Sequence, residues 1–206
     1  MTNRPYPPPK HVSEDRDAMI DLVRRFPFAT LASAGDPPAV THLPVIWAPD
    51  GEGRTLWTHL DRANPQTPLL DDKPVTVVVR GPDAYMSPEL FEGDYFPTWN
   101  YVIVECAGTA RLLQDDAQQR AILDAMAAAF EGLYGKTFSL AGKEKAVARL
   151  LPLITGVEIT VERMTGRFKL LQDRPESERE TALAAFERRP GLDAAFREQL
   201  RKLSGL

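Results

Sequence analysis

The chain has few cysteines, no long apolar run and no excess of positive charge. Its one cysteine, Cys106, cannot form an internal disulfide, so a reducing compartment is expected. No apolar run reaches the roughly 18 residues that a membrane-spanning helix needs. The first residues do not read as a signal peptide. The sequence therefore predicts a cytoplasmic protein that is not inserted in a membrane.

The charge balance and the scarcity of histidine exclude two further classes. Lys and Arg number 25 against 29 Asp and Glu, a net charge of −4, which disfavours a general polyanion binder. The three histidines, His11, His42 and His59, do not lie four residues apart or near Cys106. The sequence therefore predicts no metal site.

The 206 residues, 43% of them hydrophobic and 26% charged, suffice for one core and an appendage. Hydrophobic periodicity and turn signals predict six strands, at residues 28–33, 39–47, 54–59, 74–80, 99–113 and 157–161. The first three are expected to form a meander, with Pro44 at an edge or bulge. We expect a long aromatic loop over residues 81–98 and a turn away from the sheet at residues 165–168. Helices are predicted at residues 13–26, 116–133, 143–151, 176–189 and 192–203, the last two separated by Pro190-Gly191.

The pattern favours an α+β protein: an antiparallel barrel of about six strands with flanking helices and a helical C-terminal tail. Cys106 falls in an apolar strand and is expected to be inert core. We divide the chain into residues 1–173, the barrel, and residues 174–206, a helical extension.

A polar turn follows the third strand. Thr58, His59, Arg62 and Asn64 place donors where a short helix is expected to begin, and amides at a helix start favour an anion. Arg62 can bind two phosphate oxygens at once. The turn is either a small phosphate or flavin-phosphate site or a capped helix start with a surface arginine.

Two other features carry open alternatives. His42 and His59, on neighbouring strands of the expected meander, either face one cleft or form hydrogen bonds within the barrel wall. In the segment Pro97–Tyr101, Trp99 and Tyr101 are expected on one face of a strand and Asn100 on the other. A large ring beside an amide suits a planar heteroaromatic ligand, but it equally suits core packing.

Five segments occur in the order found in one family: THLP (residues 41–44), HLDRANPQ (59–66), GPDAYMSP (81–88), PTWNY (97–101) and FKLLQDR (168–174). Together they resemble the PaiB-like family of FMN-binding negative transcriptional regulators, which has a flavin-binding split β-barrel. The sequence departs from the family pattern at Leu171-Gln172-Asp173 and at Glu89-Leu90-Phe91. The second departure predicts a different wall to the ligand cleft.

The resemblance implies a homodimer with FMN in clefts between subunits and residues 1–173 as the FMN-binding domain. The strand Thr41, His42, Leu43 and Pro44 would face the flavin ring edge. The phosphate would be held by Thr58, His59, Arg62, Ala63 and Asn64. Thr98, Trp99 and Asn100 would approach from the partner subunit, and Lys169 would lie near the ring or ribityl chain.

Three functions stay open at this stage. The first is a flavoprotein in which FMN senses redox state or turns over a small substrate. The second is a DNA-binding regulator, for which the tail is the best candidate, although its 7 basic and 6 acidic residues give only +1. The third is an interaction module without flavin, or a barrel that binds haem.

Overall fold

A computed structural model describes residues 7–51, 53–188 and 192–206 of the chain. The predicted break at Pro190-Gly191 lies outside these residues. The described residues contain eight strands and five α-helices, in agreement with the α+β class expected from the sequence.

The strands are β1 Val12–Ser13, β2 Phe28–Ser33, β3 Ala39–Pro44, β4 Ile46–Trp47, β5 Thr55–Asp61, β6 Lys73–Met86, β7 Thr98–Leu113 and β8 Ile154–Lys169. The α-helices are α1 Arg16–Arg25, α2 Asp116–Leu133, α3 Glu144–Leu150, α4 Glu176–Glu187 and α5 Ala194–Ser204. Four 3₁₀ turns, η1 Pro9–His11, η2 Thr67–Leu69, η3 Pro88–Leu90 and η4 Leu151–Leu153, join them within the described residues.

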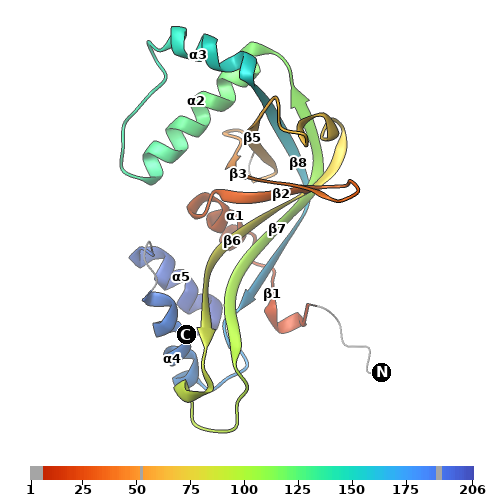
Figure 1. Cartoon of the computed structure of the whole chain (residues 1–206). Helices are drawn as coiled ribbons and strands as arrows, with labels where there is room; N and C mark the ends of the chain where they lie inside the picture. The colour runs from red at the N-terminus through yellow and green to blue at the C-terminus, as the bar shows by residue number, and fades with distance from the viewer. Residues whose placement is uncertain (1–6, 52, 189–191) are drawn as a thin grey trace. The chain divides into compact units, whose positions relative to one another are not determined.

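The strands form one antiparallel sheet of the split-barrel type, with the order β3-β2-β6-β7-β8-β5-β4 and with β1 added to β8 (Figure 1). The chain divides into two compact units. Unit 1 holds residues 1–19, 80–104 and 165–206, and unit 2 holds residues 20–79 and 105–164. The long strands β6, β7 and β8 contribute residues to both units.

The pairing within unit 2 corrects the expected meander. β2 pairs with β3 and with β6, whereas β5 pairs with β4 and β8. Pro44 does interrupt the second predicted strand, and the chain resumes as β4. β3 and β5 therefore lie at different places in the strand order and meet by packing, without a shared ladder.

Two predicted breaks are absent. β6 continues to Met86, into the first part of the expected loop. Ala84 and Met86 are buried while Tyr85 points outward, which is the alternation of a strand. β8 continues through the expected turn at residues 165–168. Gly166 serves close packing there: a Cβ on it would lie 2.9 Å from the Met19 sulfur and 3.1 Å from the Ser13 Cβ.

One core cluster of unit 2 lies between the sheet and α2. Ile122 and Met126 of α2 pack with Ile46 and Leu113, and Phe130 covers the edge of this cluster. Asp115 begins the helix, since its side chain accepts a hydrogen bond from the Gln118 amide. Cys106 is fully buried, as the apolar pattern of its strand predicts.

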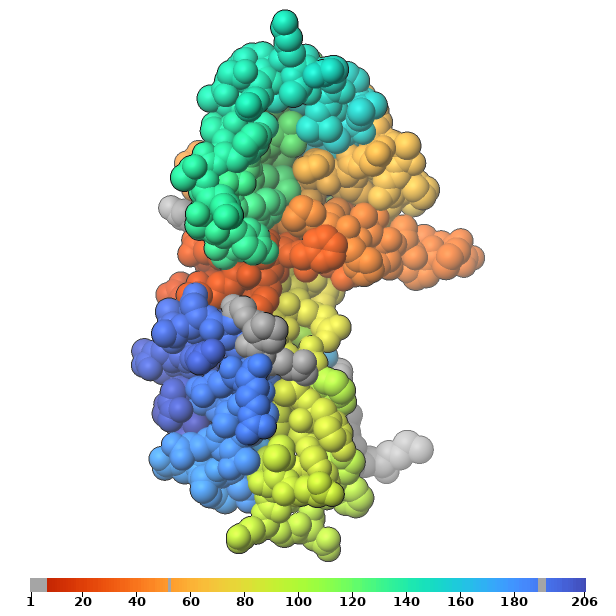
Figure 2. All heavy atoms as spheres, turned by 60° about the vertical axis from the view of Figure 1, so that its left-hand side comes forward, coloured from red at the N-terminus to blue at the C-terminus, as the bar shows by residue number. Residues whose placement is uncertain are grey.

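Unit 1 joins the tail helices to the hairpin of β6 and β7. The blue helices α4 and α5 lie beside the yellow-green hairpin in both views (Figures 1 and 2). Phe186, Phe196 and Leu200 are buried there. Arg179 ties the two helices together by donating to the Ser204 and Gly205 carbonyls at 2.8 and 2.6 Å.

Candidate functional site

The backbone amides of the polar turn after β5 already donate hydrogen bonds within unit 2. The Arg62 amide donates to the Leu153 carbonyl at 2.8 Å, and the Ala63 amide donates to Asp61 Oδ1 at 2.8 Å. The Asn64 amide donates to the Asp61 carbonyl at 3.0 Å, and the Gln66 amide to Asn64 Oδ1 at 2.8 Å. The expectation of unpaired amides at a helix start is therefore wrong, and an anion at this turn must be met by side chains.

Arg62 is the strongest side-chain donor of the turn. Its Nε and Nη2 atoms donate to the Ile154 carbonyl at 3.2 and 2.9 Å, which fixes the guanidinium against the start of β8. A guanidinium carries five N–H donors, so about three remain for an incoming anion. The residue itself is exposed to solvent, and Ala63 beside it is exposed as well.

Side chains join the turn to β3. Asn64 Nδ2 donates to Thr41 Oγ1 at 3.0 Å, and the fully buried Thr58 donates its hydroxyl to the Pro44 carbonyl at 2.7 Å. β3 lies at one end of the strand order, so one of its edges has no strand partner among the described strands. The structure thus brings together two segments, at residues 41–44 and 58–64, that the sequence analysis assigned to one site.

Gln66 is a supporting residue that the sequence analysis missed. Its side chain is 2% exposed, and Nε2 donates to Ser33 Oγ at 2.9 Å and to the Ala39 carbonyl at 3.1 Å. It therefore holds the turn against both β2 and β3. The only sequence signal was its position at the end of the HLDRANPQ segment.

The two histidines do not form one pair. His42 is exposed and lies 3.0 Å from Thr30 Oγ1 on β2. His59 is half-buried on β5, and its Nδ1 atom has no hydrogen-bond partner among the described residues. Burial lowers the pKa of His59, because it disfavours the charged ring. Thr58 and His59 point to opposite faces of β5, and Leu43 is buried in the core.

The remaining predicted residues belong to unit 1. Trp99 is 51% exposed and meets Tyr85 edge-to-face at 6.1 Å between ring centroids. Asn100 is 1% exposed, and neither its Oδ1 nor its Nδ2 atom has a partner among the described residues. The predicted alternation of Trp99 and Asn100 across the strand is confirmed.

Lys169 lies at the end of β8 and donates from Nζ to Thr98 Oγ1. Burial lowers the pKa of Lys169, and Lys10 lowers it further, while Asp173 acts in the opposite direction. A pocket of about 300 Å³ surrounds this pair; its other lining residues are Lys10, His11, Asp94, Tyr95, Phe96, Pro97, Leu171, Asp173 and Arg174. Leu171, at one of the departures from the family pattern, has a positive φ of 60°.

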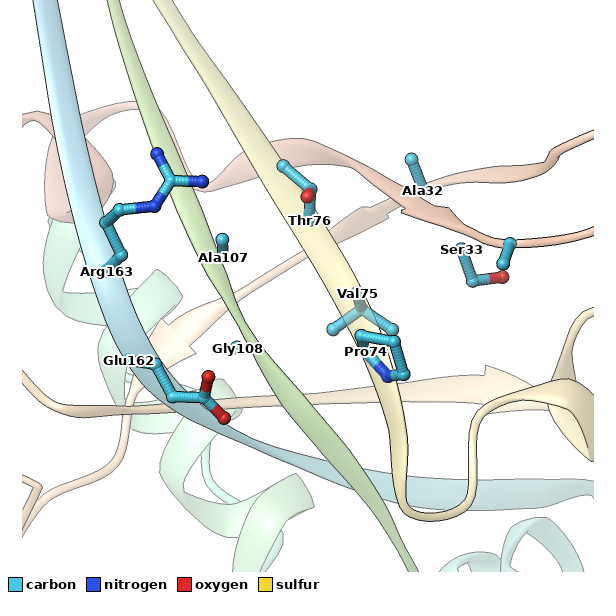
Figure 3. A pocket seen from close by; sticks show the side chains of 10 residues that line it. Ala32, Ser33, Pro74, Val75, Thr76, Ala107, Gly108, Glu162 and Arg163 are labelled. Carbon is cyan, nitrogen blue, oxygen red and sulfur yellow. The ribbon is translucent and has the colours of Figure 1, made fainter.

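A second pocket, of about 410 Å³, lies on the sheet of unit 2 and contains none of the predicted site residues (Figure 3). Small residues line it, among them Ala32, Ala107 and Gly108, with Glu162 and Arg163 of β8 at one side. Glu162 accepts a hydrogen bond from the Thr109 hydroxyl at 2.7 Å.

No group of three or more His, Cys, Asp or Glu side chains among the described residues is placed to hold a metal ion. In the same part of the chain, we find no helix long and apolar enough to cross a membrane.

Comparison with known proteins identifies the class. Residues 5–163 match a family described as "Putative FMN-binding domain". The match spans most of the chain, which therefore belongs to this family.

A curated relative is similar over two thirds of each chain. The "Protease synthase and sporulation protein PAI 2" of Bacillus subtilis is 29% identical over 148 residues, which cover 68% of this chain and 69% of the relative. This agrees with the PaiB-like resemblance stated from the motifs.

Two solved structures share the fold. The FAD and haem binding protein from Mycobacterium smegmatis superposes with a TM-score of 0.62 at 19% identity, covering 84% of this chain and 80% of that one. The flavocytochrome Anf3 from Azotobacter vinelandii gives a TM-score of 0.60 at 16% identity, with 82% and 74% covered. At these identities the likeness confirms the fold alone.

Proposed function

We propose that this protein is an FMN-binding flavoprotein in which the flavin either senses redox state or turns over a small substrate. The observation that carries the proposal is the Arg62 turn. Its guanidinium is fixed by the Ile154 carbonyl and keeps about three N–H donors, beside the hydrogen bond from Asn64 to Thr41. A phosphate with nearly two negative charges suits such donors.

The side chains present fit the cofactor. In unit 2, Arg62 would hold the phosphate, with His59 and Asn64 beside it. The Thr58 hydroxyl and the Ala63 amide already donate to the Pro44 carbonyl and to Asp61 Oδ1, so Thr58 and Ala63 would only position the turn. The strand of Thr41, His42, Leu43 and Pro44 would lie along the ring edge. Bound FMN would supply the electron-transfer chemistry, and these residues would bind and orient it.

The chemistry of the unit 1 residues also suits a flavin. Asn100 has a buried amide without partners among the described residues, which is costly. Since it is 1% exposed, it would meet a ligand only if its surroundings move. Trp99 presents half of its surface to solvent. Lys169 would lie near the ring or ribityl chain, and Thr98 would hold its ammonium group.

We propose that the protein is a homodimer in which Thr98, Trp99 and Asn100 of one protomer complete the cleft of the other. Co-expression of an Arg62→Ala chain with a Trp99→Ala chain tests this. In a mixed dimer one cleft carries both changes and the other carries none, so about a quarter of all sites should bind FMN normally. A monomer in sedimentation, or no intact sites in the mixture, would overturn the shared cleft.

The experiment that tests the cofactor is the visible spectrum of the purified protein, followed by titration of the apoprotein with FMN, FAD and haem. Flavin bands or uptake of FMN in preference to FAD are expected. A protein that takes up only haem, or none of the three, would reject the proposal. Bleaching of the bound flavin by NADH or NADPH would favour turnover over sensing.

DNA binding has less support. Within the described part of the tail, Arg174 lies over the Tyr95 ring at 4.1 Å, and Arg179 binds the Ser204 and Gly205 carbonyls. Arg201 pairs with Glu180 at 3.4 Å and Lys202 with Glu198 at 3.3 Å. Because these cations have partners inside unit 1, we propose that residues 174–206 are an extension that braces the binding domain of residues 1–173. A shift of DNA mobility at physiological salt would contradict this.

We also propose that the protein is located in the cytoplasm. One buried cysteine fits a protein kept in the reducing cytoplasm.

A further inference from the structure

Unit 2 holds an apolar pocket of about 390 Å³ to which the proposed flavin function assigns no role. It lies between the end of α1, the strand β4 and the last turns of α2. Its lining residues are Arg24, Pro27, Val45, Ile46, Trp47, Ala48, Pro49, Ala129, Phe130, Gly132 and Leu133. The volume falls within the range usual for small-molecule sites, roughly 300–1,000 Å³.

One part of the pocket wall is held in place by a hydrogen bond and core packing, and another part is exposed to solvent. Trp47 is fixed because its indole N–H donates to the Ile20 carbonyl at 3.1 Å. Phe130 packs on the core cluster that includes Ile46, whereas Leu133 at the end of α2 is 40% exposed. An apolar surface of this kind gains free energy when an apolar ligand covers it.

Among the described residues that line the pocket, Arg24 alone is charged. Among the described residues no hydrogen bond or ion pair engages its guanidinium. The neighbouring Arg25 differs, because its Nε atom pairs with Asp21 at 2.6 Å. Both arginines lie in the last turn of α1, where a cation suits the helix dipole, but only Arg24 faces the pocket.

We propose that this pocket binds a small amphipathic carboxylate, with the apolar chain or ring against Trp47 and Phe130 and the carboxylate on Arg24. Medium-chain fatty acids are the ligand class that this chemistry fits best. The donor fork of Arg24 matches a carboxylate. This site is separate from the proposed FMN site and does not depend on it.

The test is a calorimetric titration of the full-length protein with octanoate, hexanoate, octan-1-ol and octylamine. Octanoate is expected to bind more tightly than hexanoate by about fourfold for each added methylene group. Octanoate should also bind more tightly than octan-1-ol, because Arg24 attracts its carboxylate. The expected difference is only about fivefold, since Arg24 is exposed and its charge is screened. Octylamine should bind most weakly of the eight-carbon probes.

Two matched pairs of variants separate the charge from the cavity. Arg24→Gln should remove the preference for octanoate over octan-1-ol, while Arg25→Gln, with the same loss of charge one residue away, should keep it. Ala129→Trp should abolish binding of both probes by filling the pocket, while Ala128→Trp, on the same helix but outside the lining, should not.

Equal binding of octanoate, octan-1-ol and octylamine by the unchanged protein would overturn the proposal, as would binding that survives Ala129→Trp. No binding of any probe at millimolar concentration would also reject it. None of these outcomes depends on flavin uptake, so they leave the proposed FMN function unaffected.

Discussion

The proposed flavin residues of unit 2 and those of unit 1 differ in how far their hydrogen-bonding groups are satisfied. In unit 2 the turn amides, Asn64 and Thr58 all have partners within the unit, although His59 Nδ1 has none among the described residues. In unit 1 the Asn100 amide is buried and has no partner in the described part of the chain, and Trp99 is half exposed. The unit 2 part is therefore largely organised before any ligand binds. In unit 1, Trp99 has surface left for a ligand or a partner protomer to cover, whereas Asn100, at 1% exposed, is out of reach unless its surroundings move.

The largest effect on stability is expected at Gln66, the buried side chain that joins the turn of unit 2 to two strands. Gln66→Ala removes the hydrogen bonds to Ser33 Oγ and the Ala39 carbonyl and leaves a cavity. We expect the free energy of unfolding to fall by about 3 kcal/mol. Chemical denaturation measures it, and Gln118→Ala, on an exposed position, serves as the control. A loss of less than 1 kcal/mol would show that the turn does not depend on this side chain.

Arg62→Ala tests whether the organised turn binds the cofactor. Loss of a charged hydrogen bond costs about 1.5–3 kcal/mol, so the dissociation constant for FMN should rise roughly tenfold to a hundredfold. Arg62→Lys should recover part of the loss, since it restores the charge but not the planar fork. Arg80→Ala, an arginine paired with Asp83 in unit 1, should leave the constant unchanged. An unaltered constant in Arg62→Ala would remove Arg62 from the site.

Asn100→Leu tests whether the buried amide of unit 1 takes part in FMN binding. The substitution keeps the approximate volume and removes two unpartnered polar atoms, so the apoprotein should gain about 1 kcal/mol of stability. FMN affinity should fall at the same time if the amide meets the ligand. Melting temperatures with and without FMN measure both effects. Higher stability with unchanged affinity would give Asn100 no part in binding.

The smallest effect is the pH dependence due to His59. Burial lowers its pKa in the folded protein below the ordinary value of 6.5, so the unfolded chain takes up a proton more readily. The contribution of His59 to the free energy of unfolding is therefore fully present above pH 6.5 and declines as the pH falls below it. His59→Gln should flatten this slope in denaturation curves between pH 7 and pH 5. Part of the slope should remain in His59→Gln, because burial also lowers the pKa of His11.

Several elements follow from local pattern. The strand at residues 28–33 and the helix at residues 116–133 have the bounds that periodicity and capping predict. The Pro44 interruption also follows, because proline cannot donate to a ladder. By contrast, the sequence reading missed the strand beyond Arg80 and the continuation of β8 past Thr165. Glycine and proline there resemble turn residues. At Gly166 the glycine instead allows the close approach of Met19 and Ser13, which the sequence does not show.

The sequence by itself determined the class of this protein, because five segments in a fixed order resemble one family and residues 5–163 match it. It also determined which faces of β7 point inward, since alternation is a property of a single strand. Only the tertiary structure decided that Arg62 is fixed by the Ile154 carbonyl, that Gln66 joins the turn to two strands and that β3 and β5 meet without pairing. Those relations join residues far apart in the chain, and their energies depend on packing that local sequence does not specify.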